Sequence, residues 1–190
     1  MNTEELNALK ERAYKTAVEH GFHEEEKPDA YWLGLVMSEM GEAINADRKG
    51  MHADVVLFND DLGKLPFKES FEAHIKDTVE DEIADIVIRL LDFAGMKGCT
   101  LLISGFCLPS SIVVIREFAG NGLPGTLIQL IGSLYFSLNK NRVNRAIGDV
   151  IEILSNCFEK MTDSDHDLWW FVKQKMRYNE QRPMLNGKKY

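Results

Sequence analysis

The sequence predicts an all-α protein: a bundle of about six helices that forms one domain over residues 1–190. Apolar side chains recur at the three-to-four-residue spacing of a helix face along nearly the whole chain. Capping residues and glycines separate these segments at the points where helices begin and end. Residues 112–115 have the composition of a strand, but no neighbouring segment offers a strand to pair with. We therefore expect helices only.

The first two helices have clear boundary signals. Leucines and alanines form one stripe over residues 6–17, and Gly21 follows at a plausible end of that helix. A second helix is expected over residues 30–49, where Asp29 is the candidate N-cap and Gly50 the candidate stop. Both segments have the length of an ordinary globular helix.

The next segment is interrupted before helical periodicity returns. Residues 51–70 hold Gly63 and Pro66, and they are predicted to form a loop or a short insertion. A third helix is expected over residues 71–96, with Gly98 beyond its end.

Three more helices are expected after an irregular apolar segment, residues 98–111. They span residues 123–138, 142–161 and 167–179. Asp163 or Asp165 is the candidate N-cap of the last helix, and Pro183 lies beyond its end.

A faint internal repeat links the third and fifth predicted helices. Residues 82–91 resemble residues 146–155, and Asp85 and Asp149 fall in register. Either residues 112–162 are a degenerate second copy of a helical pair, or two amphipathic helices align by chance. Residues 123–138 contain no acid, so a second copy would have lost any metal site.

Composition restricts the class of protein. The three cysteines are widely spaced and form no CxxC pair, which argues against a disulfide framework or a zinc site and favours the cytoplasm. The acidic N-terminal segment is unlike a secretory signal. The most apolar stretch, residues 99–115, is short for a membrane span and is interrupted by glycine and proline. We expect no membrane partner.

The charge is unevenly distributed along the chain. The net charge is −8, yet residues 173–190 carry six basic side chains against Glu180 alone. An acidic body disfavours nonspecific nucleic-acid binding. The basic tail either completes a site for an anionic, metal-bound ligand or is a solvated terminus.

Two pairs of acids lie within apolar helical segments. Glu39 and Glu42 are three residues apart, as are Glu82 and Asp85, so each pair lies on one helix face. A carboxylate on a mostly buried face needs a partner. Antiparallel neighbouring helices would bring four oxygen donors together, the ligand type that Mg²⁺ and Mn²⁺ prefer. The alternative to a metal site is that each pair of acids lies on a helix face exposed to solvent. A ferritin-like di-iron site is excluded, because no histidine follows a glutamate by three residues.

Three segments carry a family resemblance. Ser38-Glu-Met-Gly-Glu42, followed by Glu82-Ile-Ala-Asp85, resembles the EExxE…ExxD signature of the MazG-like, all-α NTP pyrophosphatase superfamily. Residues 175–190, KMRYNEQRPMLNGKKY, resemble the family's ending K-x-x-x-N-x-x-R-P…H-G-K. Here Ser38 replaces the first glutamate, Asn186 replaces the histidine, and residues 98–165 lie outside the resemblance.

The resemblance implies a cytoplasmic enzyme that hydrolyses a nucleoside triphosphate to a monophosphate and pyrophosphate, as in house-cleaning of the nucleotide pool. Its expected cofactor is Mg²⁺, with Mn²⁺ as a substitute, and its expected assembly is a homo-oligomer such as a dimer. The implied metal-binding and catalytic residues are Glu39, Glu42, Glu82 and Asp85. The implied phosphate-binding residues are Lys175, Asn179, Arg182 and Lys188.

Two further side chains near the acids have two interpretations each. Trp32, two turns before Glu39, either stacks on the base of the substrate or belongs to the core. Arg89, one turn past Asp85, pairs either with a carboxylate or with a phosphate, and we expect the carboxylate.

Two other functions share these features. One is a non-catalytic helical module that binds a nucleotide or a partner without turnover, which the loss of a glutamate at Ser38 favours. The other is a hydrolase with the same carboxylates that prefers dUTP or a phosphoribosyl-ATP-type substrate.

Overall fold

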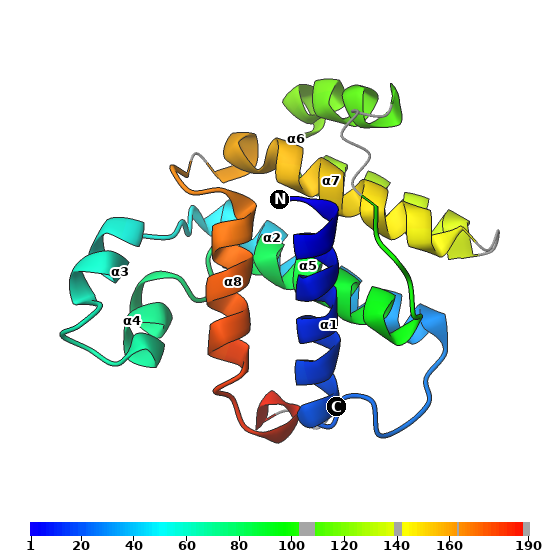
Figure 1. Cartoon of the computed structure of the whole chain (residues 1–190). Coiled ribbons are helices and arrows are strands. Elements are labelled where there is room, and N and C mark those ends of the chain that lie inside the picture. The colour runs from blue at the N-terminus through cyan, green and yellow to red at the C-terminus, as the bar shows by residue number, and fades with distance from the viewer. Residues whose placement is uncertain (103–108, 139–141, 163, 188–190) are drawn as a thin grey trace.

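The computed structural model describes residues 1–102, 109–138, 142–162 and 164–187. Within these ranges the fold is all-α, as predicted, and the only β-pairing is an isolated bridge between Leu62 and Leu65. There are eight α-helices in the described ranges, not about six (Figure 1). They are α1 (Thr3–Glu19), α2 (Asp29–Lys49), α3 (Val55–Asp61), α4 (Phe67–His74), α5 (Val79–Met96), α6 (Pro109–Leu138), α7 (Val143–Thr162) and α8 (Leu168–Asn179), followed by the 3₁₀ turn η1 (Met184–Gly187).

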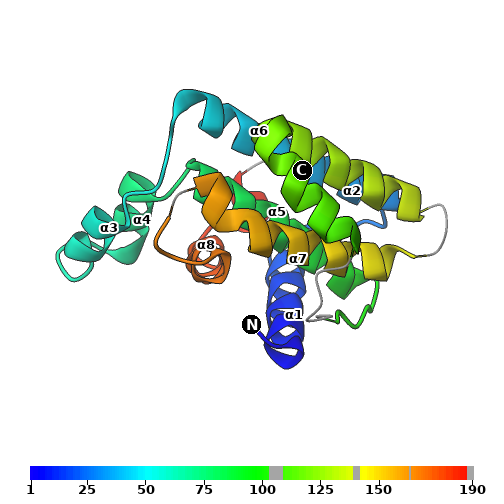
Figure 2. The same ribbon diagram turned by 90° about the horizontal axis from the view of Figure 1, so that it is seen from above.

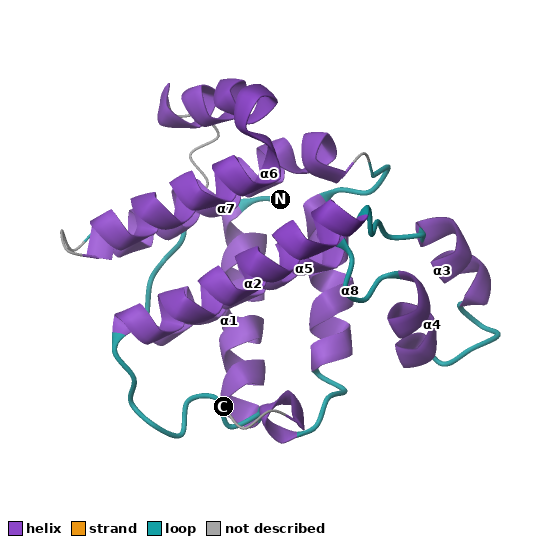
Figure 3. Ribbon diagram, turned by 180° about the vertical axis from the view of Figure 1, so that it is seen from behind, coloured by secondary structure: helices purple, strands orange, loops and turns teal. Residues whose placement is uncertain are grey.

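Helix α5 is the centre of the bundle and packs against α1, α2, α7 and α8. Figure 1 shows α1 and α8 crossing one side of α5, and Figure 3 shows α2 on the other side. Its apolar side chains are fully buried on more than one face, among them Ile86 and Leu91, which are five residues apart and point in different directions from the helix axis. Any polar group on α5 that lies between its neighbours therefore occupies an enclosed position.

Helices α6 and α7 pack against each other and cover α2 and α5, as the view from above shows (Figure 2). The predicted helix over residues 123–138 is the second part of α6, because Gly122 adopts a left-handed conformation (φ 60°) just before Pro124. The candidate strand at 112–115 and the predicted irregular residues 109–111 lie inside the first part of α6. The duplication of a helical pair stays a prediction.

The prediction of one continuous third helix over residues 71–96 is wrong, because the structure has two helices there, α4 and α5. Asp77 has a positive φ of 63°, and the Thr78 side chain accepts a hydrogen bond from the Asp81 amide, so a new helix starts here. No glycine or proline marks this break, and the apolar periodicity continues through it.

Residues 51–70 were predicted to form a loop or a short insertion, and the loop is wrong, because they hold α3 and the first turn of α4. The insertion stays a prediction. Asp54 caps α3 by accepting from the Leu57 amide, and the Ser70 hydroxyl donates to the Phe58 carbonyl. Phe58 is buried and packs against Phe67, so α3 and the first turn of α4 are joined to the hydrophobic core of the bundle. Figure 1 shows the two helices projecting from one side of the bundle.

Two predicted N-caps are also corrected. Asp29 is the first residue of α2, and Pro28 occupies the cap position without a side-chain hydrogen bond. Asp167 caps α8 through its own side chain, while Asp165 precedes it and Asp163 lies outside the described residues. Gly50 does end α2 in the left-handed conformation, as predicted.

None of the helices in the described ranges combines the length and apolar character that a membrane crossing requires.

The closest approach of α1 and α5 depends on Gly95. A Cβ atom at this position would lie 2.5 Å from the Tyr14 Cβ. We expect Gly95→Ala to lower the free energy of unfolding by about 1–3 kcal/mol, because the added methyl forces the helices apart. Gly34→Ala is the matched control: a Cβ there meets nothing within 4 Å, so helix propensity should raise stability by about 0.5–1 kcal/mol. Urea unfolding measures both, and equal midpoints would contradict the packing argument.

Candidate active site

A pocket of about 260 Å³ lies where α1, α2, α5 and α8 meet. Helices α1 and α8 both pack on α5, so the space between them is enclosed by α5 and α2. Seven of the nine predicted site residues line this pocket, although they come from three separate parts of the chain: Glu39, Glu42, Glu82, Asp85, Lys175, Asn179 and Arg182.

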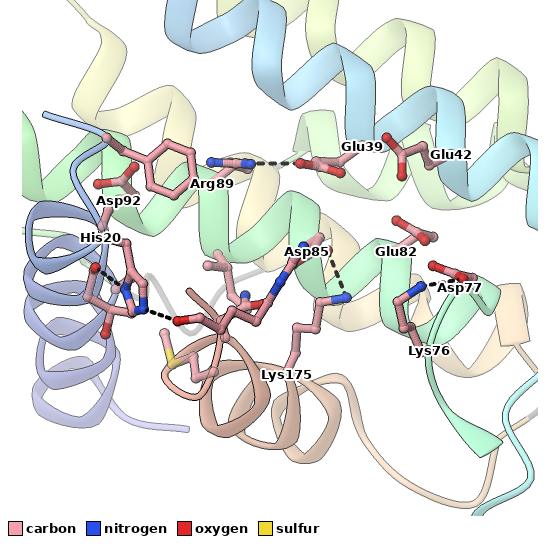
Figure 4. Close-up of a pocket in the computed structure, with 18 residues that line it drawn as sticks. His20, Glu39, Glu42, Lys76, Asp77, Glu82, Asp85, Arg89, Asp92 and Lys175 are labelled. Atoms are coloured by element: carbon pink, nitrogen blue, oxygen red, sulfur yellow. Dashed lines mark hydrogen bonds and ion pairs between the residues drawn. The ribbon is translucent and has the colours of Figure 1, made fainter. Parts of the chain in front are cut away.

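Three glutamates converge at one end of the pocket. One carboxylate oxygen from each of Glu39, Glu42 and Glu82 lies within 4.8 Å of the other two. Figure 4 shows Glu39 and Glu42 on α2 facing Glu82 on α5. Mg²⁺ binds oxygen at about 2.0–2.1 Å, so two of its ligand oxygens lie about 3–4 Å apart. Small side-chain rotations would bring the three oxygens to that separation.

Glu82 has the environment of a carboxylate that lacks its partner. Its side chain is only 4% exposed, and its Oε2 atom is buried without a hydrogen-bond donor. Burial, together with the charges of Asp85 and Asp81, raises the pKa of Glu82 to about 8. A buried charge without a partner is costly, and a divalent cation would supply that partner. The residues present therefore fit a metal ion.

Glu39 is fixed in place by an arginine. The Arg89 Nε atom donates to Glu39 Oε1 over 3.0 Å, and both side chains are largely buried. Burial, and then the charge of Asp85, raises the pKa of Glu39, while Arg89 opposes this shift. Arg89 thus pairs with a carboxylate, as expected from the sequence, and leaves Glu39 oriented toward the other two glutamates.

Asp85 is held by Lys175, which was predicted to bind phosphate. The Lys175 ammonium lies 2.6 Å from Asp81 Oδ2 and 2.9 Å from Asp85 Oδ2. Burial lowers the pKa of Lys175, but the two carboxylates outweigh burial and raise it overall. This lysine lines the pocket, yet its charge is already shared between two acids.

Asp81 was not among the predicted site residues. It is completely buried, its Oδ1 atom has no hydrogen-bond partner, and burial raises its pKa to about 6 despite the nearby Lys175. The sequence did offer one signal, because Asp81 precedes Asp85 by four residues and so lies on the same helix face.

The break before α5 adds two residues that the sequence analysis missed. Lys76 and Asp77 line the pocket and form an ion pair with each other. Oxygens of Asp77, Asp81 and Glu82 also lie within 4.8 Å of one another. A continuous helix through residues 71–96 would place Lys76 and Asp77 on a regular helix surface, so only the correct break reveals them.

The remaining predicted residues are divided between the pocket, the core and the undescribed tail. Asn179 and Arg182 line the pocket. Trp32 is 3% exposed, stacks on His23 at 4.5 Å between ring centroids, and does not line the pocket, which supports its interpretation as a core residue. Lys188 lies outside the described residues.

The arrangement as a whole can hold a cation among carboxylates next to a cavity that also presents Lys76 and Arg182. Such a combination suits metal-assisted chemistry on a phosphorylated ligand, in which charge neutralisation and positioning are the main tasks of the protein.

Comparisons with protein-family models, curated proteins and solved structures find no match to this chain.

Proposed function

We propose that this protein is a Mg²⁺-dependent pyrophosphohydrolase that cleaves a nucleoside triphosphate to a monophosphate and pyrophosphate. The observation that supports this most strongly is the convergence of Glu39, Glu42 and Glu82 within 4.8 Å, with an unpartnered, buried oxygen on Glu82. The resemblance of these positions to the MazG-like signature supports the same reaction.

In this proposal the glutamates hold Mg²⁺, or Mn²⁺ in its place, and Asp85 joins them from the Lys175 side. The ion supplies positive charge to the phosphate oxygens and polarises the bond that breaks. The carboxylates also orient the attacking water, and one of them accepts its proton. Arg89 keeps Glu39 in the required rotamer through its 3.0 Å hydrogen bond.

The phosphate chain needs more positive charge than one ion provides. Arg182, with its planar fork of donors, suits two phosphate oxygens, and Asn179 one turn earlier offers a neutral donor. Lys76 lines the same pocket from the break before α5. Lys175 contributes indirectly, because its ammonium neutralises the carboxylates of Asp81 and Asp85. The tail is thus part of the site in this proposal.

A non-catalytic nucleotide-binding module is the second candidate, and its support is Ser38 in place of a glutamate. Ser38 is exposed on α2 and does not line the pocket. The three glutamates converge without a fourth at that position, so the substitution does not weaken the catalytic proposal.

We further propose a cytoplasmic homo-oligomer. Met37 on α2 and Ile128 and Tyr135 on α6 are more than half exposed, and a contact between subunits over these two helices would remove their apolar surface from water. Sedimentation velocity distinguishes a dimer from a monomer, and a monomer at micromolar concentration would contradict this part of the proposal.

A pyrophosphate-release screen over canonical and modified NTPs and dNTPs, dUTP included, tests the function. We expect release with Mg²⁺ and none with EDTA, because the carboxylates repel the phosphate chain without a cation. Orthophosphate as the first product would refute a pyrophosphohydrolase. Binding of nucleotides with no product from any of them would favour the non-catalytic module.

A further inference from the structure

The pocket has two chemically different ends, and the glutamates occupy only one of them. Glu82 and Asp92 are ten residues apart on α5, which corresponds to about 15 Å along the helix axis. Figure 4 shows Glu42, Glu82 and Asp77 at one end and His20 and Asp92 at the other. A metal bound to the glutamates leaves the far end for another part of the ligand.

The far end has walls suited to an apolar, planar group. Ala13 and Ala17 on α1 are small side chains facing the cavity, and Ile88 on α5 and Met176 on α8 also line it. Small-molecule sites combine such apolar walls with a few fixed polar groups. A phosphate chain gains nothing from these side chains, whereas a nucleobase does.

Asp92 is the fixed polar group at this end. It lines the pocket, is only 3% exposed, and its Oδ1 atom accepts from His23 Nε2 over 2.7 Å. His23 is held in turn by the stacked ring of Trp32 and the edge of Tyr14. The carboxylate therefore has a set orientation before any ligand binds.

His20, by contrast, serves as a wall and not as a ligand. One ring nitrogen lies 2.8 Å from the Thr16 carbonyl and the other 2.9 Å from the Arg182 carbonyl. Both ring nitrogens thus face backbone carbonyl oxygens, so neither is directed at a ligand in the cavity. This leaves Asp92 as the group with which the far end can recognise a hydrogen-bond donor on a ligand.

We infer that the end of the pocket between α1 and Asp92 is a nucleoside subsite, and that the Asp92 carboxylate accepts a hydrogen bond from the nucleoside. The inference rests on the proposed function, because the phosphates are assigned to the glutamate end. Three kinds of nucleoside group offer the required donor: an exocyclic amino group of the base, a ring N–H of the base (N3–H of uracil or N1–H of guanine) and a hydroxyl of the sugar. Asp92 is the residue that recognises the nucleoside in each case.

Filling the subsite tests its location. Ala17→Leu adds three carbons to the wall, and Ala8→Leu is the matched control, since Ala8 is exposed on the same helix and does not line the pocket. Calorimetry with Mg²⁺ and a non-hydrolysable α,β-imido nucleotide should show about tenfold weaker binding for Ala17→Leu and no change for Ala8→Leu. Inorganic tripolyphosphate, which lacks a nucleoside, should bind both variants as it binds the wild type.

Asp92→Asn tests the donor and identifies its source. Asparagine can still accept from His23, but its amide nitrogen replaces one acceptor with a donor. If an exocyclic amino group supplies the donor, analogues of dCTP and dATP should lose about tenfold in affinity relative to the dUTP analogue. If the ring N–H supplies it, the dUTP analogue should lose about tenfold relative to them. If the 2′-hydroxyl supplies it, ribonucleotides should lose about as much relative to deoxynucleotides, and if the 3′-hydroxyl supplies it, deoxynucleotides should lose about as much relative to 2′,3′-dideoxynucleotides.

The outcomes separate the subsite from the reaction. Nucleotide binding that neither variant weakens selectively would overturn the subsite and leave the proposed hydrolysis intact. A wild type that binds tripolyphosphate but no nucleotide would overturn both the subsite and the proposed function. If both variants weaken nucleotide binding as expected but the wild type never hydrolyses the nucleotide, the subsite is supported and the proposed function is refuted.

Discussion

Glu82→Gln is expected to lower kcat by at least about a hundredfold while the protein stays folded, because the change removes a metal ligand but almost no volume. Without metal the variant should unfold at a higher temperature than the wild type at pH 7. The pKa of Glu82 in the fold is about 8, far above that of an exposed glutamate, so the fold resists its ionised form. An uncharged amide removes that conflict. Steady-state kinetics and thermal unfolding measure the two effects.

Glu42→Gln should cause a similar loss of turnover with little change in stability, since Glu42 is exposed on α2. Glu159→Gln is the control for both variants, because Glu159 is exposed on α7 and does not line the pocket. Full turnover by the Glu42 and Glu82 variants would show that these carboxylates do not form the metal site.

Lys175→Met should destabilise the protein by about 3–5 kcal/mol, the usual cost of leaving a buried charge without its partner. Methionine fills most of the space, but Asp81 loses the ammonium 2.6 Å away and is completely buried. Lys173→Met is the matched control: Lys173 is exposed on the same helix, so its loss should cost little. Urea unfolding gives the two free energies.

A double variant distinguishes a charge effect from a packing effect. Asp81→Asn removes the stranded charge, so the pair Lys175→Met and Asp81→Asn should be more stable than Lys175→Met alone. A double variant in which the two losses simply add would mean that Lys175 contributes through packing, and the counter-charge role assigned to it would be wrong.

The helices could be predicted where the chain carries its own boundary signals. Gly50 ends α2 in a conformation that glycine favours. The break at Asp77 has no such signal. The positive φ of Asp77 is imposed where α4 meets α5, and nothing in the sequence distinguishes Thr78 as an N-cap from a threonine inside a helix. The fold of residues 51–70 was equally hidden, since Phe58 becomes a core residue only through the contacts of α3 with α4 and α8.

The sequence predicted most of the residues that line the candidate site, but not which of their side chains contact one another. Spacing alone placed Glu39 with Glu42, and the packing of α2 on α5 brings Glu82 to them. That Lys175 reaches Asp81 and Asp85 depends on where α8 crosses α5, which no local pattern encodes. Asp92 lay outside the recognised motif and gains its role only from the pocket and from His23.

The most direct test of the central claim is a ³¹P NMR time course of the protein with Mg²⁺ and an accepted nucleoside triphosphate. We predict that the triphosphate signals give way to those of a monophosphate and pyrophosphate, and that EDTA or the Glu82→Gln substitution stops the change. The appearance of a diphosphate and orthophosphate, or of the same products at the same rate without Mg²⁺, would contradict it.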